Sequence, residues 1–197
     1  MRRPEYDPKA TKAPNMKISC TNKLQPKLRK HVIALTKFTV NTIFTKRQIK
    51  KLNTISIRID KTLNNSTIHN VDAVPLAYMD AEIDCYDERQ NPKDFIIWIN
   101  PFFTRKNLSK HTKTTFAETI IHEIVHIKQA LSGEMKQVLR NGNMVIKFHK
   151  KYYKLDSNDS YWLFPWEVEA RGHEKGVLNL YCIKNECFRE FPDIPLK

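Results

Sequence analysis

The chain has 197 residues, of which 41% are hydrophobic and 28% charged, and its formal net charge is +13. Its 10 Phe, 7 Tyr and 3 Trp exclude a disordered chain, and its 4 Gly exclude glycine-rich phosphate loops. The longest apolar run, Phe95 to Ile99, is far shorter than the roughly 18 residues of a membrane span, so we expect no membrane partner.

Three prolines interrupt the start of the chain, which predicts an extended basic tail over residues 1–22. This segment has no apolar stretch of the kind found in secretory signals, so we expect a cytoplasmic protein. Residues 23–197 have the length of a single domain. Within that domain, residues 23–61 are predicted to form a basic, helical N-terminal part.

The positive charge is concentrated at the N-terminal end. Residues 1–61 contain 16 Lys or Arg and three Asp or Glu, whereas the rest of the chain contains 18 of each. Because a basic segment attracts polyanions, we expect nucleic acid or another acidic partner to bind through residues 1–61. The alternative is a solvated Lys-rich surface without a specific partner. No helix-turn-helix, RRM or zinc-finger signature accompanies the charge.

Apolar spacing predicts a helix over residues 26–38 that begins near Pro26, followed by a second helix or a continuation over about 41–52. The alternation of Ile55, Ile57 and Ile59 with polar residues predicts a half-buried strand. Next along the chain we expect a loop over residues 64–74 and strands over residues 77–86 and 95–99.

The second half of the chain begins with the longest helical pattern, over about 112–131, which ends at Ser132-Gly133. From Asn141-Gly142-Asn143 through Leu155 the pattern predicts a small hairpin or meander. Pro165 is placed to open a last helix that runs to about Leu180. Helices and strands in this order predict an α+β domain.

Four cysteines, Cys20, Cys85, Cys182 and Cys187, occur without a CxxC spacing. This spacing argues against a zinc ribbon or a redox pair. Free thiols are the expected state in a chain without an export signal, and a disulfide between Cys182 and Cys187 is the alternative.

The segment His122-Glu123-Ile124-Val125-His126 is an HExxH motif in the middle of the long predicted helix. Two histidines four residues apart project from one helical face, so both imidazoles reach one metal ion. Glu123 lies about 100° further round the helix, where it contacts a water on the metal without being a ligand. The alternative interpretation is a chance match, a risk with every short motif.

A catalytic zinc site needs a third protein ligand. The chain lacks the HExxHxxGxxH extension, which argues against a metzincin. The downstream candidates all lie on the last predicted helix and are Glu167, Glu169 and His173.

The HExxH motif, followed about 40 residues later by Pro165-Trp166-Glu167-Val168-Glu169-Ala170, resembles the gluzincins, which are zinc peptidases with two His ligands and one Glu ligand. The combination also looks like small metallopeptidases predicted from tailed-phage genomes, for which host cytoplasm or the virion is the expected location. The resemblance covers about Phe95 to Leu180, and residues 1–60 lie outside it. It implies a zincin-like fold with a small mixed sheet on the HExxH helix and a C-terminal ligand-bearing helix.

This resemblance implies that His122, His126 and Glu167 bind Zn²⁺ and that Glu123 is the general base. Members often carry Asp four residues after the ligand Glu, where it supports a ligand histidine. This chain has Arg171 there, which leaves that supporting contact without an obvious residue and keeps Glu169 as an alternative ligand.

Zincins bind an extended peptide at an edge strand before the zinc helix. By this resemblance, the candidate strand here consists of Phe95, Ile96, Ile97, Trp98 and Ile99, with a buried core strand as the alternative. An oxyanion in such a site also needs a hydrogen-bond donor. Candidates are Tyr161 and His149, and beside them Tyr152 and Tyr153.

We therefore predict a zinc metallopeptidase that acts on a protein or peptide substrate. The competing hypothesis is a non-catalytic, zinc-containing binding or virion-associated protein whose basic N-terminal part recruits nucleic acid or an acidic partner. A third hypothesis combines the two as a peptidase directed to DNA-bound proteins. SprT-like proteases do this, but they resemble the chain less, because their third ligand is usually His.

Overall fold

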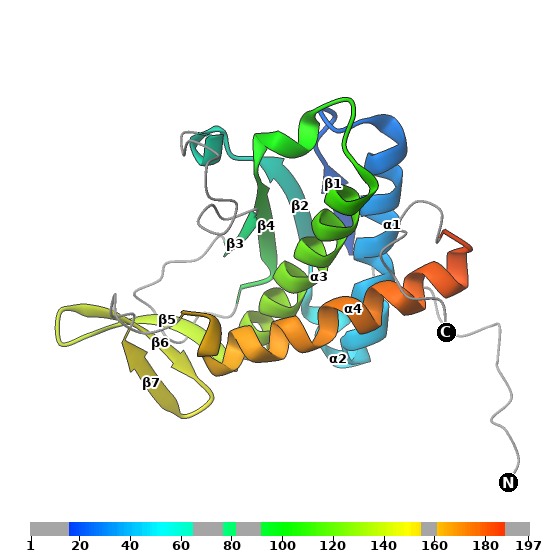
Figure 1. The fold of residues 1–197 in the computed structure, drawn as a ribbon. Coiled ribbons are helices and arrows are strands. Elements are labelled where there is room, and N and C mark those ends of the chain that lie inside the picture. The colour runs from blue at the N-terminus through cyan, green and yellow to red at the C-terminus, as the bar shows by residue number, and fades with distance from the viewer. Residues whose placement is uncertain (1–15, 65–76, 82–91, 155–160, 188–197) are drawn as a thin grey trace, which may run out of the picture.

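A computed structural model gives the arrangement of the chain and describes residues 16–64, 77–81, 92–154 and 161–187 (Figure 1). In these ranges the chain forms four α-helices and two small β-sheets, in agreement with the expected α+β class. Residues 1–15 of the predicted tail, the expected loop beyond residue 64, residues 82–86 of the predicted strand, and Cys85 lie outside the described residues.

The larger sheet has four strands in the order β1-β2-β4-β3. Parallel pairing joins β1 (Lys17–Cys20) to β2 (Thr54–Ile59) and β2 to β4 (Asp94–Ile99), whereas β3 (Ala77–Ala81) is antiparallel to β4. The sheet is therefore mixed, as expected. Short 3₁₀ helices, η1 (Lys61–Asn64) and η2 (Pro101–Thr104), follow β2 and β4.

The structure corrects the prediction for residues 17–20, which belong to the sheet and not to a separate tail. Strand β1 pairs residue by residue with β2, and Ile18 lies opposite Ile55. Cys20 and Leu24 are buried in the same hydrophobic core as β2 and β4. The proline pattern indicated the extended backbone but not the strand partner, which lies more than 30 residues further along the chain.

Two helices follow β1. Helix α1 (Pro26–Ile43) opens with a proline and runs five residues beyond the predicted end, whereas α2 (Lys46–Lys51) is a separate short helix. The break between them comes from local chemistry. Phe44 adopts an extended conformation, and Thr45 and Gln48 form a capping box, in which each side chain accepts from the backbone N–H of the other.

Helix α3 (Lys110–Ser132) is the centre of the molecule (Figure 1). The Ser109 hydroxyl caps its first turn by accepting from the Thr112 N–H. Gly133 ends the helix with a φ of 76°, the left-handed conformation that glycine adopts without strain, so the predicted C-cap is confirmed. Its apolar face packs on the four-stranded sheet through Phe116, Ile120, Ile124 and Ile127.

The second sheet is an antiparallel meander of β5 (Met135–Arg140), β6 (Asn143–Phe148) and β7 (Lys151–Lys154). Asn141 and Gly142, both with positive φ, form the tight turn between β5 and β6. The prediction located this turn but omitted β5. The reason is that β5 starts two residues after the end of α3, with no further turn signal between them.

After η3 (Tyr161–Leu163), helix α4 (Pro165–Asn185) begins at the predicted proline and ends at Glu186 in a left-handed conformation. It crosses α3 and extends from the meander to α1 (Figure 1). Cys20, Cys182 and Cys187 are free thiols, as expected. Among the described residues, no helix has both the length and the apolarity that a membrane span requires.

Candidate metal centre

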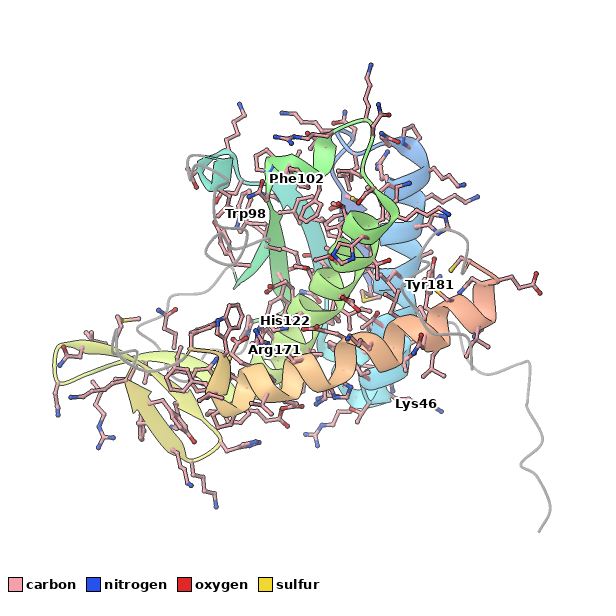
Figure 2. The ribbon with its side chains drawn as sticks, in the orientation of Figure 1. Lys46, Trp98, Phe102, His122, Arg171 and Tyr181 are labelled. Atoms are coloured by element: carbon pink, nitrogen blue, oxygen red, sulfur yellow. The ribbon has the colours of Figure 1, made fainter. Side chains whose placement is uncertain are left out.

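His122, His126 and Glu167 meet where α3 and α4 cross, and Figure 2 shows His122 at this crossing. The His122 Nε2 and His126 Nε2 atoms are 3.0 Å apart. The Glu167 carboxylate faces both, with Oε2 3.1 Å from His122 Nε2 and Oε1 3.3 Å from His126 Nε2. One ligand atom from each residue lies within 4.8 Å of the other two, so a single metal ion can bind to all three.

Local sequence explains why these three side chains converge. The four-residue spacing in the HExxH motif places both imidazoles on the face of α3 that is turned towards α4. Pro165 fixes the first turn of α4, so Glu167 becomes the third residue of that helix. A carboxylate in the first turn also interacts favourably with the helix dipole.

The donor set fits a cation. The Glu167 side chain is 1% exposed, and neither of its oxygens accepts a hydrogen bond of normal geometry. Leaving a buried carboxylate in this state is costly, and a metal ion between the carboxylate and the two imidazoles removes the cost. Two nitrogen ligands and one oxygen ligand match the protein ligands of catalytic zinc sites.

Hydrogen bonds behind the two histidines orient them towards the centre. His122 Nδ1 lies 2.7 Å from Glu174 Oε1, and His126 Nδ1 lies 2.8 Å from Gln129 Oε1. Because a carboxylate and an amide oxygen only accept, both imidazoles donate from Nδ1. Each Nε2 lone pair is then directed at the metal position, as in other metal sites with supporting hydrogen bonds.

Glu174 is the functional residue that the sequence interpretation missed. The resemblance pointed to residue 171 for this support, but the Arg171 guanidinium lies 4.1 Å over the Trp162 ring instead. Glu174 is seven residues after Glu167, two helical turns, so the two carboxylates share one face of α4. That spacing was the available signal.

Glu169 and His173 are not part of the three-residue cluster. The Glu169 carboxylate accepts from Lys128 Nζ at 3.0 Å and from Gln129 Nε2 at 3.1 Å. Gln129 Nε2 also donates to the Trp166 carbonyl at 3.1 Å. Glu169 therefore orients Gln129, which in turn orients His126, and of the two glutamates only Glu167 faces the histidines.

The charges at the centre favour a cation. Burial alone would raise the pKa of the Glu167 carboxyl, but the His122 and His126 imidazoles beside it hold that pKa well below its usual range. Burial alone would lower the pKa of His122, but the Glu167 and Glu174 carboxylates raise it to about 9. The two shifts have one cause, the attraction between the carboxylates and the imidazoles, and the carboxylates around His122 favour a proton or a metal ion at this position.

Glu123 and Tyr161 lie beside the three ligands. The Glu123 side chain is buried, and its charge acts on both His122 and Tyr161. Burial and the neighbouring Glu167 carboxylate raise the pKa of the Tyr161 hydroxyl, so this hydroxyl stays protonated at neutral pH. Tyr161 is thus the one oxyanion candidate that the structure relates to the centre within the described residues.

The other oxyanion candidates have their described contacts elsewhere. The His149 ring packs against Phe148, and the Tyr153 ring packs against Phe164 and Trp166. Tyr152 contacts Arg140 and Lys147 on the meander.

The prediction that Phe95–Ile99 is a free edge strand is wrong. These residues form β4, which is paired on one side with β2 and on the other with β3. Its Phe95, Ile97 and Ile99 side chains are buried in the core, as the alternative interpretation held. Within the described part of the chain, β3 is the edge strand on this side of the sheet, and it contacts α3. Hydrophobic pattern alone does not distinguish interior strands from edge strands.

Comparison of the chain with protein-family models, curated proteins and solved structures finds no match.

Proposed function

We propose that the protein is a zinc-dependent metallopeptidase of the gluzincin type, with a zincin-like fold. The observation that carries the proposal is the convergence of His122, His126 and Glu167. Glu123, which lies next to the first ligand in the sequence, adds the acid–base group that hydrolysis needs. The mixed sheet on one side of α3 and the ligand-bearing helix on the other support the resemblance to this family.

Zinc is the metal that this donor set suits best, because catalytic zinc sites combine three His or carboxylate ligands with one open position. When bound there, Zn²⁺ would polarise the attacking water and the scissile carbonyl as a Lewis acid. The protein holds its three ligands rigidly, since Glu174 and Gln129 fix the two imidazoles and burial fixes Glu167.

Glu123 would act as the proton carrier. Its carboxylate takes a proton from the attacking water as the oxygen bonds to the peptide carbon. It then gives that proton to the leaving nitrogen as the C–N bond breaks, so the carboxylate is restored at the end of the cycle. The Tyr161 hydroxyl would donate a hydrogen bond to the carbonyl oxygen as negative charge develops on it.

A protein or peptide substrate would bind in extended form along β3. An edge strand presents backbone N–H and C=O groups to an added strand, and this mode of binding requires little from the substrate sequence. Contact between β3 and α3 brings such a peptide to the helix that carries Glu123.

Conversion of the Glu123 carboxylate to an amide tests this function. Glu123→Gln is expected to retain the metal and to lower hydrolysis of an unfolded protein substrate by about 10²–10⁴-fold, the contribution of general acid–base catalysis. Glu186→Gln, the same change at an exposed position after α4, is the matched control and should leave the rate unchanged. A Glu123→Gln enzyme that cleaves as fast as the wild type would disprove the mechanism.

A second candidate function is a non-catalytic one, in which the basic N-terminal part recruits nucleic acid or an acidic partner. The observation that favours it is that α1 and α2 contain no acidic residue, while α2 exposes Lys46, Arg47, Lys50 and Lys51. Salt-sensitive binding of duplex DNA that is lost when these four are changed to Gln, together with no hydrolysis of any substrate, would support it over the peptidase.

A further inference from the structure

The three-stranded meander has one strongly basic face, which the overall charge balance of the second half of the chain conceals. Residues 135–154 contain six Lys or Arg and no Asp or Glu. Lys136 lies opposite Lys147, Lys147 lies opposite Tyr152, and Lys154 lies opposite Val145. Side chains alternate between the two faces of a sheet, and opposite residues share a face. The following residues are therefore on one side, here named the basic face: Lys136, Arg140, Lys147, Tyr152 and Lys154.

Part of the other side of the meander packs against the rest of the protein, whereas Leu139 and Met144 on that side are exposed. The Phe148 and Tyr153 rings contact the buried Trp166 ring, with centroids 5.8 and 5.3 Å apart. These two residues alternate with Lys147 and Tyr152 along their strands, so the basic face is turned away from Trp166. In Figure 1 the meander extends beyond the four-stranded sheet, at the N-terminal end of α4.

Tyr152 is the aromatic centre of the basic face, and its side chain is 40% exposed. The Arg140 guanidinium lies 4.3 Å from the ring centroid and Lys147 Nζ lies 5.4 Å from it. Arg140 is on β5 and Tyr152 on β7, so the two side chains meet across β6. Val138 and Val145, on the same face, are buried and form an apolar floor. The arrangement is a supported aromatic group surrounded by cations.

We propose that the basic face binds single-stranded nucleic acid. The Tyr152 ring and the Arg140 guanidinium supply planar surfaces on which unpaired bases stack, and the charges of the exposed Arg140 and Lys154 neutralise phosphates. A duplex keeps its base faces stacked inside the helix, so an exposed aromatic group among cations favours the unpaired strand over the double helix. Every base can stack on an aromatic ring. We therefore expect the basic face to prefer single strands over duplexes and to show little preference for base sequence.

This binding is independent of the proposed hydrolysis, because it uses none of the residues of the metal centre. It goes beyond the basic N-terminal part as well, since all five residues of the basic face lie after α3. If both proposals hold, proteins on single-stranded nucleic acid are the substrates that this chain meets first.

The test measures binding of the full chain to a labelled mixed-sequence oligonucleotide, as a single strand and as a duplex, over a range of salt concentrations. Tyr152→Leu keeps an apolar side chain at this position but removes the ring, and should weaken single-strand binding by about tenfold. Arg140→Gln with Lys154→Gln should reduce the slope of log K against log salt by about 0.7 for each lost phosphate contact.

Lys106→Gln with Lys110→Gln is the matched control. It removes the same charge from exposed positions before and at the start of α3, and it should leave both the affinity and the slope unchanged. Thermal unfolding of each variant checks that the meander is intact.

Four results would overturn the proposal. One is an equal loss of binding in the two double variants, which would indicate a non-specific effect of net charge. Another is tighter binding of the duplex than of the single strand. The last two are absence of binding at low salt, and competition by polyglutamate as strong as by the oligonucleotide, which would assign the face to an acidic protein segment.

Discussion

The two halves of the contact between α3 and α4 are built from opposite chemistry. At one end, Ala117 and Ile121 of α3 pack against a fully apolar cluster on α4 that contains Val177, Leu178 and Cys182. At the other end, α3 contributes His122, His126 and Gln129, and α4 contributes Glu167, Glu169 and Glu174. One helix pair thus changes from an apolar to a polar interface within about two turns.

The difference separates a half that stabilises the fold from a half that could hold a metal ion. An apolar contact needs only area and complementary shape, and burial of its side chains stabilises the fold directly. A buried polar contact stabilises only when each group has a partner. In the polar half, Glu174, Gln129 and Glu169 have partners, whereas the Glu167 oxygens accept no hydrogen bond. This half therefore has the composition of a cation-binding site, and the unpaired Glu167 carboxylate costs stability while no cation is bound.

The largest expected effect on folding comes from the apolar half. Leu178→Ala, at a position without exposed surface, should lower the free energy of unfolding by about 2–5 kcal/mol, because it leaves a cavity between α3 and α4. Metal content of the folded variant should not change. Leu180→Ala is the matched control on the exposed side of α4 and should cost within about 0.5 kcal/mol. Urea unfolding measures both, and equal costs would contradict the assignment of the apolar half.

Glu174→Ala, in the polar half, should change metal affinity more than it changes the free energy of unfolding. Loss of the hydrogen bond to His122 Nδ1 is expected to weaken metal affinity by about 10–100-fold. Glu174→Gln should recover part of the lost metal affinity, since an amide oxygen still accepts a hydrogen bond from His122 Nδ1. Lys175→Ala, its exposed neighbour, is the control. Competition with a chromogenic chelator measures the affinity, and unchanged affinity in Glu174→Ala would remove its positioning role.

Glu169→Gln gives a smaller, pH-dependent effect. Burial raises the pKa of the Glu169 carboxyl, but hydrogen bonds from Gln129 and Lys128 lower it more, to below its ordinary value of 4.5. A lowered pKa stabilises the fold above the unfolded-state value and loses that contribution as pH falls through the folded-state value. We therefore expect the free energy of unfolding of the wild type to exceed that of Glu169→Gln by at most about 1 kcal/mol at pH 7. The difference is small because the Glu169 carboxylate is partly exposed. The difference should disappear in acid, and a difference that persists at pH 2 would contradict this origin.

The smallest expected effect is on a rate. Cys182 lies in the apolar half, where the Cys187 thiol donates to its sulfur at 3.3 Å, and burial raises the pKa of the Cys182 thiol. Because only the thiolate reacts, alkylation at pH 8 should be at least about tenfold slower in the native protein than in urea. Peptide mass spectrometry of Cys182 reports this rate, and equal rates would indicate that the apolar half is open.

Much of the polar half was predictable from sequence. The HExxH spacing predicted that His122 and His126 lie on one face, because helical geometry is local, whereas the choice of Glu167 over Glu169 and His173 came from the resemblance to the gluzincins. Residues whose role depends on long-range pairing were not predictable. Strand β1 acquires its partner from residues 54–57, and the interior position of β4 depends on β3, which no local pattern reveals.

Glu174 was missed for a related reason. Its spacing from Glu167 is a local feature, but its use depends on where His122 projects from a different helix. Support of His122 was expected from residue 171 and comes from Glu174, which is visible only when α3 and α4 are placed together. The same holds for Glu169, whose partners Lys128 and Gln129 are on α3.

The most direct test of the account is the metal content of protein purified without a metal-affinity tag, in the wild type, in Glu167→Ala and in Glu169→Ala. We expect about one zinc per chain in the wild type, loss of the metal in Glu167→Ala, and retention in Glu169→Ala, because three protein ligands define a catalytic zinc site. A wild-type protein that binds no zinc after reconstitution, or a Glu167→Ala protein that binds it as tightly as the wild type, would contradict the central claim.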